Sequence, residues 1–274
     1  MDERILMSGG LTALVPAGRR PGVDPLAAHF GADFKAVIPI HGEPMVAHVV
    51  KALLASPRVE RVVILTQEPE SFLQRPDLSW LAQDSRIVWR RSSESVSASV
   101  LDAMTALGTA QDGEASFLLT TADHPLLTPA MIDAFVTQAQ AEQADIAVGF
   151  VERRTLLAKY PENRRTWLKF RGGWYSGANL FYFGSSRVEP ALTLWREVEQ
   201  DRKKVWKLFA KFGPWLFVQA ALRLASLRSG LAAAGRKLGL KVAPVVLDIP
   251  EACIDVDKVE DFHLVEKILS GHQQ

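Results

Sequence analysis

The sequence predicts an α/β fold with a doubly wound, mostly parallel sheet. Two observations support this prediction. Short apolar runs alternate with segments of helical apolar spacing over the first 150 residues, and this alternation is typical of βαβ units. Polar residues follow several of these runs, at the positions where open α/β sheets bind their ligands. After residue 150 the alternation stops, which predicts a helical insertion near the C-terminal third.

Each predicted element follows from its apolar spacing. The predicted strands cover residues 11–16, 36–40, 61–66, 86–89, 115–119, 145–150 and 241–247. The predicted helices cover residues 44–54, 92–107, 129–135, 188–208, 212–238 and 258–269. Residues 160–183 are strand- and turn-like, with Gly172-Gly173 as the expected hairpin turn. We expect a single domain over residues 1–274, with residues 200–240 as a basic amphipathic helical insertion within it.

The composition is that of a soluble globular protein, with 48% hydrophobic and 23% charged residues in a chain of 274. A net charge of +1 gives no general attraction to polyanions, so we expect no nucleic-acid partner. The single Cys253 excludes a disulfide framework and fits a reducing compartment. Because residues 1–10 lack the features of a signal peptide and no apolar stretch could span a bilayer, we expect a cytoplasmic protein.

Asp123 follows the predicted strand that ends near Thr120, and Thr128 and Pro129 then suit the N-cap and first position of a helix. A carboxylate at the end of a central strand is a natural ligand for Mg²⁺, which usually takes one or two such ligands together with substrate phosphates. A turn-capping role for Asp123 is the structural alternative. We expect the neighbouring His124 to be satisfied within the turn.

The first predicted strand leads into the loop Ala17-Gly18-Arg19-Arg20. Small residues there let backbone N–H groups meet phosphate oxygens, and arginine suits bidentate contact with phosphate. Lys35 precedes the strand predicted at 36–40 and could add a point charge to the same phosphates. The loop matches neither a Walker A loop nor a GxGxxG loop, so a solvated loop is the alternative.

Three motifs together resemble those of nucleotidyltransferases with a glycosyltransferase-A-like Rossmann fold. This superfamily includes the MobA-like guanylyltransferases of the molybdenum cofactor and the methylerythritol-phosphate cytidylyltransferases. The run 15–20, Lys35 and the turn 39–45 resemble its opening signature. Residues 121–127 resemble its second motif, whose Asp binds Mg²⁺, and residues 254–261 resemble its closing motif, whose Asp completes the metal site. The resemblance covers residues 11–269 and implies both the fold and Mg²⁺-dependent nucleotidyl transfer.

The resemblance also implies roles for single residues. Asp123 and Asp255 would hold the metal, with Asp257 as the alternative to Asp255, although Asp257 would also suit the N-cap of the final helix. The family loop often reads Ala-Gly-x-Gly-x-Arg and is shorter here, so Arg20 takes the place of the family arginine, with Arg19 as the alternative. Arg20 and Lys35 would then be the catalytic cations.

Two further positions follow from the same resemblance. Ser99 matches the serine at which cytidylyltransferases meet the nucleotide base, with Arg91 nearby, and a serine-rich helix start is the alternative. Asn179 lies between small residues in a strand-like segment and would contact the acceptor. Residues 153–171 contain seven Lys/Arg and one acid, which suits an acceptor bearing negative charge, although a solvated basic face is typical of most such clusters.

Residues 202–241 contain ten Lys/Arg and no acid. Core packing with the lysine stems along apolar surface is one interpretation of this segment. The other is peripheral contact with an anionic membrane through residues 203–240. Membrane contact would suit an enzyme that activates a small phosphate for lipid head-group or surface-glycan precursor synthesis.

We therefore predict a Mg²⁺-dependent nucleotidyltransferase with Ala17, Gly18, Arg19 and Ser99 as nucleotide-binding residues. CTP is the expected donor, and a small phosphorylated alcohol or acid is the expected acceptor. The alternatives are a guanylyltransferase of the molybdenum-cofactor type, a glycosyltransferase that uses an NDP-sugar, and a non-catalytic nucleotide-binding regulator. A glycosyltransferase would normally carry Asp-x-Asp where this chain has Asp123-His124-Pro125.

Overall fold

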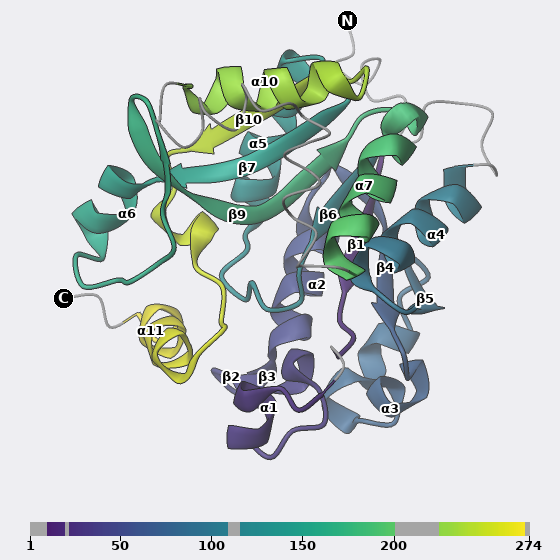
Figure 1. The fold of residues 1–274 in the computed structure, drawn as a ribbon. Coiled ribbons are helices and arrows are strands. Elements are labelled where there is room, and N and C mark those ends of the chain that lie inside the picture. Colours follow the sequence, from purple (N-terminus) through teal and green to yellow (C-terminus); the bar gives the residue numbers. More distant parts are fainter. Residues whose placement is uncertain (1–9, 20–21, 109–115, 201–224, 272–274) are drawn as a thin grey trace, which may run out of the picture.

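A mixed, mostly parallel sheet forms the centre of the computed structural model, which describes residues 10–19, 22–108, 116–200 and 225–271 (Figure 1). Its strands lie in the order β10-β7-β9-β6-β1-β4-β5, and β8 pairs with β9 beside this path. The strands span Val242–Leu247 (β10), Ile146–Glu152 (β7), Gly173–Phe183 (β9), Phe117–Thr120 (β6), Leu11–Pro16 (β1), Val59–Thr66 (β4), Ile87–Arg91 (β5) and Leu168–Phe170 (β8). Only β9 runs against its two neighbours β6 and β7 on this path. The prediction of a doubly wound, mostly parallel sheet is confirmed.

Helices cover both faces of the sheet, as the alternation along the central strands requires (Figure 1). In β1, Ala13 and Val15 pack in the larger core cluster, which also holds the buried side of α2 (Met45–Ala55) and α5 (Pro129–Ala141). Leu14 faces the opposite way, into the cluster beneath α4 (Val96–Gly108) and α7 (Glu189–Gln200). Side chains of β1 are therefore buried on both faces, as expected for a central strand.

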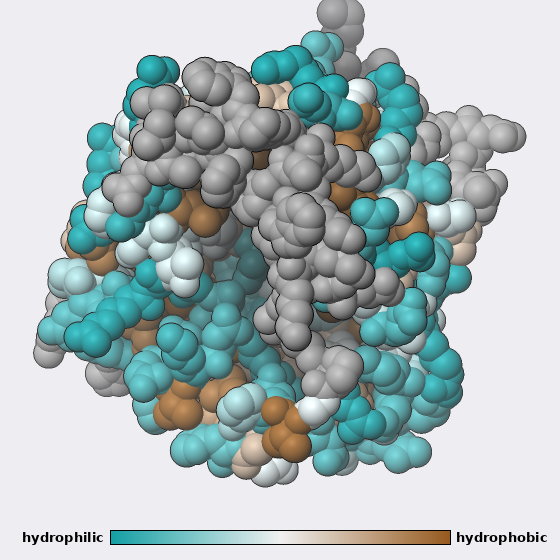
Figure 2. Space-filling model, in the orientation of Figure 1, coloured by the Kyte–Doolittle hydropathy of each residue, from teal (hydrophilic) through white to brown (hydrophobic). Residues whose placement is uncertain are grey.

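The remaining helices lie around this three-layer centre. They are α1 (Pro25–His29), α3 (Pro69–Leu73), α6 (Arg153–Lys159), α10 (Leu227–Lys237) and α11 (Val259–Leu269), with short 3-10 segments at Lys35–Val37, Pro76–Ala82, Ser186–Val188 and Pro250–Cys253. None of the described helices combines the length and apolar character that a membrane span requires. Among the coloured residues in Figure 2, hydrophilic ones predominate and apolar ones form small separate patches.

The strand predicted at residues 36–40 is wrong for most of its length. Lys35–Val37 form a 3-10 helix, and only Pro39–Ile40 (β2) pair, with Glu43–Pro44 (β3), in a separate two-stranded sheet. Ala36, Val37 and Ile38 are nevertheless buried. Periodicity cannot separate a short buried strand from another buried segment, and Pro39 cannot donate a hydrogen bond to a central ladder.

The hairpin turn at residues 172–173 forms as predicted, between β8 and β9. Gly172 has φ +97°, a conformation that glycine adopts without steric cost. The helix α6 at Arg153–Lys159 was not predicted, because these residues were interpreted only as part of a basic cluster. The expected helical insertion is described only at its borders, α7 and α10, and residues 201–224 lie outside the described part of the chain.

The two outer strands of the main sheet both carry residues that disfavour further pairing. Pro244 lies in the middle of β10, opposite Val148 of β7. At the other end of the sheet, β5 finishes with Arg90 and Arg91. These residues occupy the edges at the two ends of the strand path β10 to β5.

Candidate active site

The carboxyl ends of β1 and β6 lie side by side and bring the first two motifs together. The Ala122 N–H donates to the Pro16 carbonyl across 3.3 Å, which fixes the turn after β6 against the end of β1. Thr128 then caps α5 by accepting a hydrogen bond from the Met131 N–H at 3.2 Å. Asp123 is therefore held between a strand and a helix at the edge where parallel sheets bind ligands.

A backbone hydrogen bond holds the closing motif, residues 254–261, beside Asp123. The Val256 N–H donates to the Asp123 carbonyl at 2.9 Å, so residues 255–257 lie beside Asp123. The chain then enters α11, where the Asp261 carboxylate accepts from the N–H groups of Asp257 and Lys258. The N-cap is Lys258 rather than Asp257, which leaves the Asp257 side chain available for another partner.

That partner is Lys35. Its ammonium group lies 2.6 Å from Asp123 Oδ2 and 2.6 Å from Asp257 Oδ1. Burial alone would lower the pKa of Lys35, but the charges of the two aspartates raise it above its ordinary value. Burial alone would raise the pKa of Asp123, but the charge and hydrogen bond of Lys35 lower it. Three side chains from distant parts of the sequence therefore form one charged cluster.

The donor set of this cluster fits a hard divalent cation. Two carboxylates converge on one position, which the Lys35 ammonium occupies in this structure. Asp123 Oδ1 is buried and has no hydrogen-bond partner among the residues that the structure describes. The same residues contain no group of three or more His, Cys, Asp or Glu side chains around a common metal position. Two carboxylates completed by substrate phosphates are the usual arrangement for Mg²⁺.

Asp255 is engaged elsewhere. One of its carboxylate oxygens forms an ion pair with Arg165, and the other accepts a hydrogen bond from Asn179 Nδ2 at 2.8 Å. The side chains of Arg165 and Asp255 are only 11% and 15% exposed. Of the two aspartates in the closing motif, Asp257 shares the Lys35 ammonium group with Asp123, whereas Asp255 binds Arg165 and Asn179.

The loop after β1 is fixed by Gln67, which follows β4. Gln67 accepts a hydrogen bond from the Arg19 N–H at 3.0 Å and donates one to the Arg19 carbonyl at 2.9 Å. A Cβ atom on Gly18 would approach Gln67 Oε1 to 2.5 Å, so glycine permits this close packing. Ala17 is held by a bond from its N–H to the Leu65 carbonyl.

The arginines of this loop differ in what the structure describes. Arg19 pairs with Glu68 at 2.6 Å, and its guanidinium lies 5.2 Å from the centre of the Phe34 ring. Phe34 directly precedes Lys35, so the loop contacts the segment that carries the lysine. Arg20 lies outside the described residues.

Ser99 is buried and directed inward. Its hydroxyl accepts from the Ser93 N–H at 2.9 Å and donates to the Ser95 carbonyl at 2.7 Å. These bonds shape the loop before α4. The N-terminus of α4 is held by Glu199 of α7, which accepts from the N–H groups of Val96 and Ser97. Ser99 therefore shapes the loop before α4, and its hydroxyl is engaged within that loop.

His124 is almost fully buried, and burial lowers its pKa to about 4. Its Nε2 lies 3.4 Å from the Glu251 carbonyl of the 3-10 segment before the closing motif. His124 is thus neutral near pH 7 and contacts the closing segment instead of being satisfied within its own turn.

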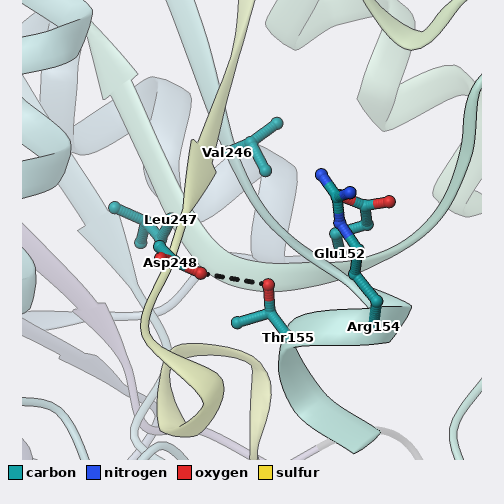
Figure 3. Close-up of a pocket in the computed structure, with 6 residues that line it drawn as sticks. All are labelled: Glu152, Arg154, Thr155, Val246, Leu247 and Asp248. Atoms are coloured by element: carbon teal, nitrogen blue, oxygen red, sulfur yellow. Dashed lines mark hydrogen bonds and ion pairs between the residues drawn. The ribbon is translucent and has the colours of Figure 1, made fainter. Parts of the chain in front are cut away.

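A pocket of about 520 Å³ lies at the outer end of the same sheet edge (Figure 3). It is lined by Glu152, Arg154, Thr155, Val246, Leu247 and Asp248. Its charged groups already have partners: Arg154 pairs with Glu152 at 2.7 Å, and Thr155 donates to Asp248 at 3.1 Å. The charged side chains of this pocket are therefore paired with one another or with Thr155.

Sequence reasoning missed two residues of the site. Gln67 directly follows a strand on the same edge as Asp123, and this position was the available signal. Arg165 is one of seven basic residues in 153–171, and nothing in the sequence separates it from its exposed neighbour Arg164. Only the fold brings Arg165 to Asp255.

The fold and the sequence together define the class of this protein as a nucleotidyltransferase. Residues 26–213 match the model of the family described as the MobA-like NTP transferase domain. The match covers more than half of the chain, so the protein belongs to this family and is an enzyme of the transferase class. No curated protein matches the sequence.

Solved structures agree with this assignment. A hypothetical transferase from Thermus thermophilus is 27% identical, with a TM-score of 0.72 over 92% of this chain and 99% of that chain. CMP:2-keto-3-deoxy-manno-octonic acid synthetase complexed with CTP is 14% identical, with a TM-score of 0.55 over 97% of this chain and 100% of its own. A 4-diphosphocytidyl-2C-methyl-D-erythritol synthase is 13% identical, with a TM-score of 0.58 over 96% and 100%. The last two share the fold.

Proposed function

We propose that this nucleotidyltransferase transfers CMP from CTP to a small phosphorylated acceptor and releases pyrophosphate. The observation that carries the proposal is the convergence of Asp123 and Asp257 on a single cation position, next to the loop after β1. Two of the similar solved structures have names or ligands that contain a cytidine nucleotide, which supports CTP as the donor. Because these two structures are only 14% and 13% identical to this chain, cytosine is proposed as the donor base.

In this reaction an oxygen of the acceptor phosphate attacks the α-phosphorus of CTP. The bond from the α-phosphorus to the bridging oxygen of the β-phosphate breaks, and that oxygen leaves with pyrophosphate. With a dianionic acceptor phosphate the charges balance without a proton transfer, so the site needs no general base. Catalysis then depends on positioning and on electrostatic stabilisation of the phosphates.

Asp123 and Asp257 would hold Mg²⁺, which supplies positive charge to the phosphate oxygens when it is bound. Lys35 then exchanges its two carboxylate partners for the triphosphate, because its ammonium group occupies the position between them. The backbone of Ala17 and Gly18, with Arg19 and Arg20, would bind the same phosphates. Ser99 would act on base binding by shaping the loop before α4, and Asn179 would face the acceptor.

The first test is pyrophosphate release with Mg²⁺ and each of the four NTPs, against a panel of phosphorylated alcohols, acids and sugars. We expect acceptor-dependent release with CTP, and a loss of at least ~100-fold in Asp123→Ala, as for other groups that stabilise transition-state charge. Asp133→Ala is the matched control, because Asp133 of α5 is 53% exposed and pairs with Arg58.

Release with GTP alone would move the donor to guanine. Transfer from an NDP-sugar without pyrophosphate release would replace the proposal by the glycosyltransferase alternative. NTP binding without turnover of any acceptor, unaffected by Asp123→Ala, would favour a regulator.

A further inference from the structure

Two cations contact the motif residues beside β6: Lys35 contacts Asp123 and Asp257, and Arg165 contacts Asp255. In the sheet, β6 lies between β1 and β9. Lys35 belongs to the β1 side, since the loop after β1 contacts its neighbour Phe34. Arg165 belongs to the β9 side, where it pairs with Asp255, which in turn accepts a hydrogen bond from Asn179 of β9. The two carboxylates proposed above to bind the metal therefore share Lys35, and Arg165 is held by Asp255, two residues before Asp257.

The Arg165–Asp255 pair is largely withdrawn from water, with both side chains no more than 15% exposed. Burying two charges costs free energy, and a well-packed apolar pair of similar volume often gives equal or higher stability. Stability alone therefore does not explain why this ion pair is buried. A guanidinium group has five N–H donors, and among the described residues only Asp255 accepts a hydrogen bond from Arg165. Several donors therefore remain for a ligand, in the planar geometry that suits phosphate oxygens.

The strand beside Arg165 has both strain and space. Asn179 adopts φ +48°, which is uncommon for a residue other than glycine, and Asp255 holds its side chain in this conformation. Two residues earlier, a Cβ atom on Gly177 would meet nothing within 4 Å. This part of β9 therefore departs from regular pairing next to an open volume, as expected where a ligand approaches a strand.

We propose that Arg165 binds the phosphate group of the acceptor and directs it toward the α-phosphorus, with Asp255 and Asn179 as positioning residues. This inference rests on the proposed function. In-line displacement needs the attacking and leaving oxygens on opposite sides of the phosphorus. Lys35 on the β1 side serves the leaving pyrophosphate, and Arg165 on the β9 side serves the nucleophile. Asp255 then keeps the guanidinium fixed while the acceptor is absent.

The test compares Arg165→Gln and Arg165→Lys with Arg164→Gln. Arg164 is exposed on the same loop and provides the matched control. Inorganic phosphate serves as the probe and is titrated into protein saturated with Mg²⁺ and α,β-methylene-CTP, which occupies the donor site. We expect Arg165→Gln to weaken phosphate binding roughly tenfold or more, as for loss of a charge-assisted hydrogen bond. Arg165→Lys should retain part of the affinity, and Arg164→Gln should match the wild type.

Kinetics give an independent readout that a purely structural ion pair would not produce. For the acceptor found in the pyrophosphate assay, Arg165→Gln should raise the KM of the acceptor and leave the KM of CTP unchanged. If Arg165→Gln does not fold, the phosphate affinity of Arg165→Lys tests the proposal. Lysine keeps the positive charge but lacks the planar set of N–H donors, so its affinity should lie below that of the wild type.

Two results would overturn the proposal while the proposed function stands. One is wild-type protein that binds the analogue but no phosphate, and the other is phosphate binding that is equal in the wild type and in both Arg165 variants. A wild-type protein that binds no nucleotide analogue would instead overturn the proposed function, and this inference with it.

Discussion

Asp255 and Asp257 lie two residues apart and have separate cations. Asp257 contacts Lys35, and Asp255 contacts Arg165 and Asn179. The chain enters this motif extended, with Ile254 at φ −98° and ψ 100°. The two carboxylates therefore have different chemical environments, although the motif presents them as near-equivalent alternatives.

The metal assignment can be tested by replacing each carboxylate. With Mn²⁺ as a paramagnetic probe and nucleotide present, we expect Asp123→Asn and Asp257→Asn to weaken metal binding roughly 10-fold or more, by analogy with lost metal-site interactions. Asp255→Asn should leave Mn²⁺ affinity within about 2-fold, because Asp255 acts on Arg165. Electron paramagnetic resonance measures free and bound Mn²⁺ directly. Equal losses in Asp255→Asn and Asp257→Asn would contradict this assignment.

At the scale of elements, Asp145 connects three strands at their ends away from the active site. Its carboxylate accepts hydrogen bonds from the Lys241 N–H before β10, from the Ser185 hydroxyl after β9 and from Arg187, at 2.8–3.0 Å. Burial alone would raise the pKa of Asp145, but these three donors lower it below its ordinary 3.8. The ionised carboxylate therefore stabilises the arrangement of β7, β9 and β10.

We expect Asp145→Asn to lower the free energy of unfolding by about 1–2 kcal/mol near neutral pH, the range for charged hydrogen bonds. Because the folded pKa lies below the unfolded one, this contribution is complete above 3.8 and is lost as the pH falls through the folded pKa. Urea denaturation at several pH values measures it. Asp133→Asn, at a carboxylate 53% exposed, should cost less than about 1 kcal/mol. A difference that grows toward acid pH would contradict the linkage.

The sequence predicted most of the central elements, because their apolar spacing agrees with their burial. The runs at 61–66 and 145–150 became β4 and β7 within two residues at each end. The strand prediction for residues 36–40 was wrong because these residues are mostly buried, as predicted, but do not pair as a strand of the main sheet. Residues 67–85 received no prediction, although they form α3 and a 3-10 helix around Phe72 and Leu78.

The site was predictable only in part. The strand-end position of Asp123 follows from sequence order, because parallel strands meet at one edge. The pairing of Lys35 with Asp257 joins residues 222 positions apart, and sequence spacing cannot specify it. Ser99 illustrates the same limit, since its motif position gave no sign that the hydroxyl points into its own loop.

At the scale of the whole molecule, the proposed function predicts that Lys35 couples metal binding to nucleotide binding. The Lys35 ammonium group lies between the two carboxylates that would hold Mg²⁺, so it would have to move for the metal to bind, and the triphosphate would be its new partner. Metal and nucleotide should therefore bind far better together than separately, which is a positive coupling free energy between two ligands.

Thermal unfolding provides the measurement. Mg²⁺ and CTP together should raise the melting temperature by more than the sum of their separate effects, with ligand at 100 times Kd adding about 2.7 kcal/mol. Lys35→Met should bind Mg²⁺ or Mn²⁺ more tightly without nucleotide, and the coupling should fall. Lys51→Met is the control, since Lys51 pairs with Glu43 on the surface. Unchanged metal affinity in Lys35→Met would contradict the coupling.

Three expectations about the whole chain stay predictions: a single domain over residues 1–274, the insertion at 200–240 and membrane contact through 203–240. The described end of that segment, α10, packs beside β10, and its Arg228 pairs with Glu142 of the turn after α5. Arg236 and Lys237 of α10 stay exposed, and residues 203–224 lie outside the described part of the chain.

Pro244 and the arginines of β5 have a consequence for how these molecules behave in crowded solution. Open sheets expose backbone donors and acceptors along their outermost strands, and neighbouring copies can zip together there into fibrils. The ring nitrogen of Pro244, which cannot donate a hydrogen bond, interrupts the border at β10, and the arginines of β5 place charged side chains at the other end of the strand path. We therefore expect molecules of this enzyme to resist pairing through β10 or β5 at high concentration.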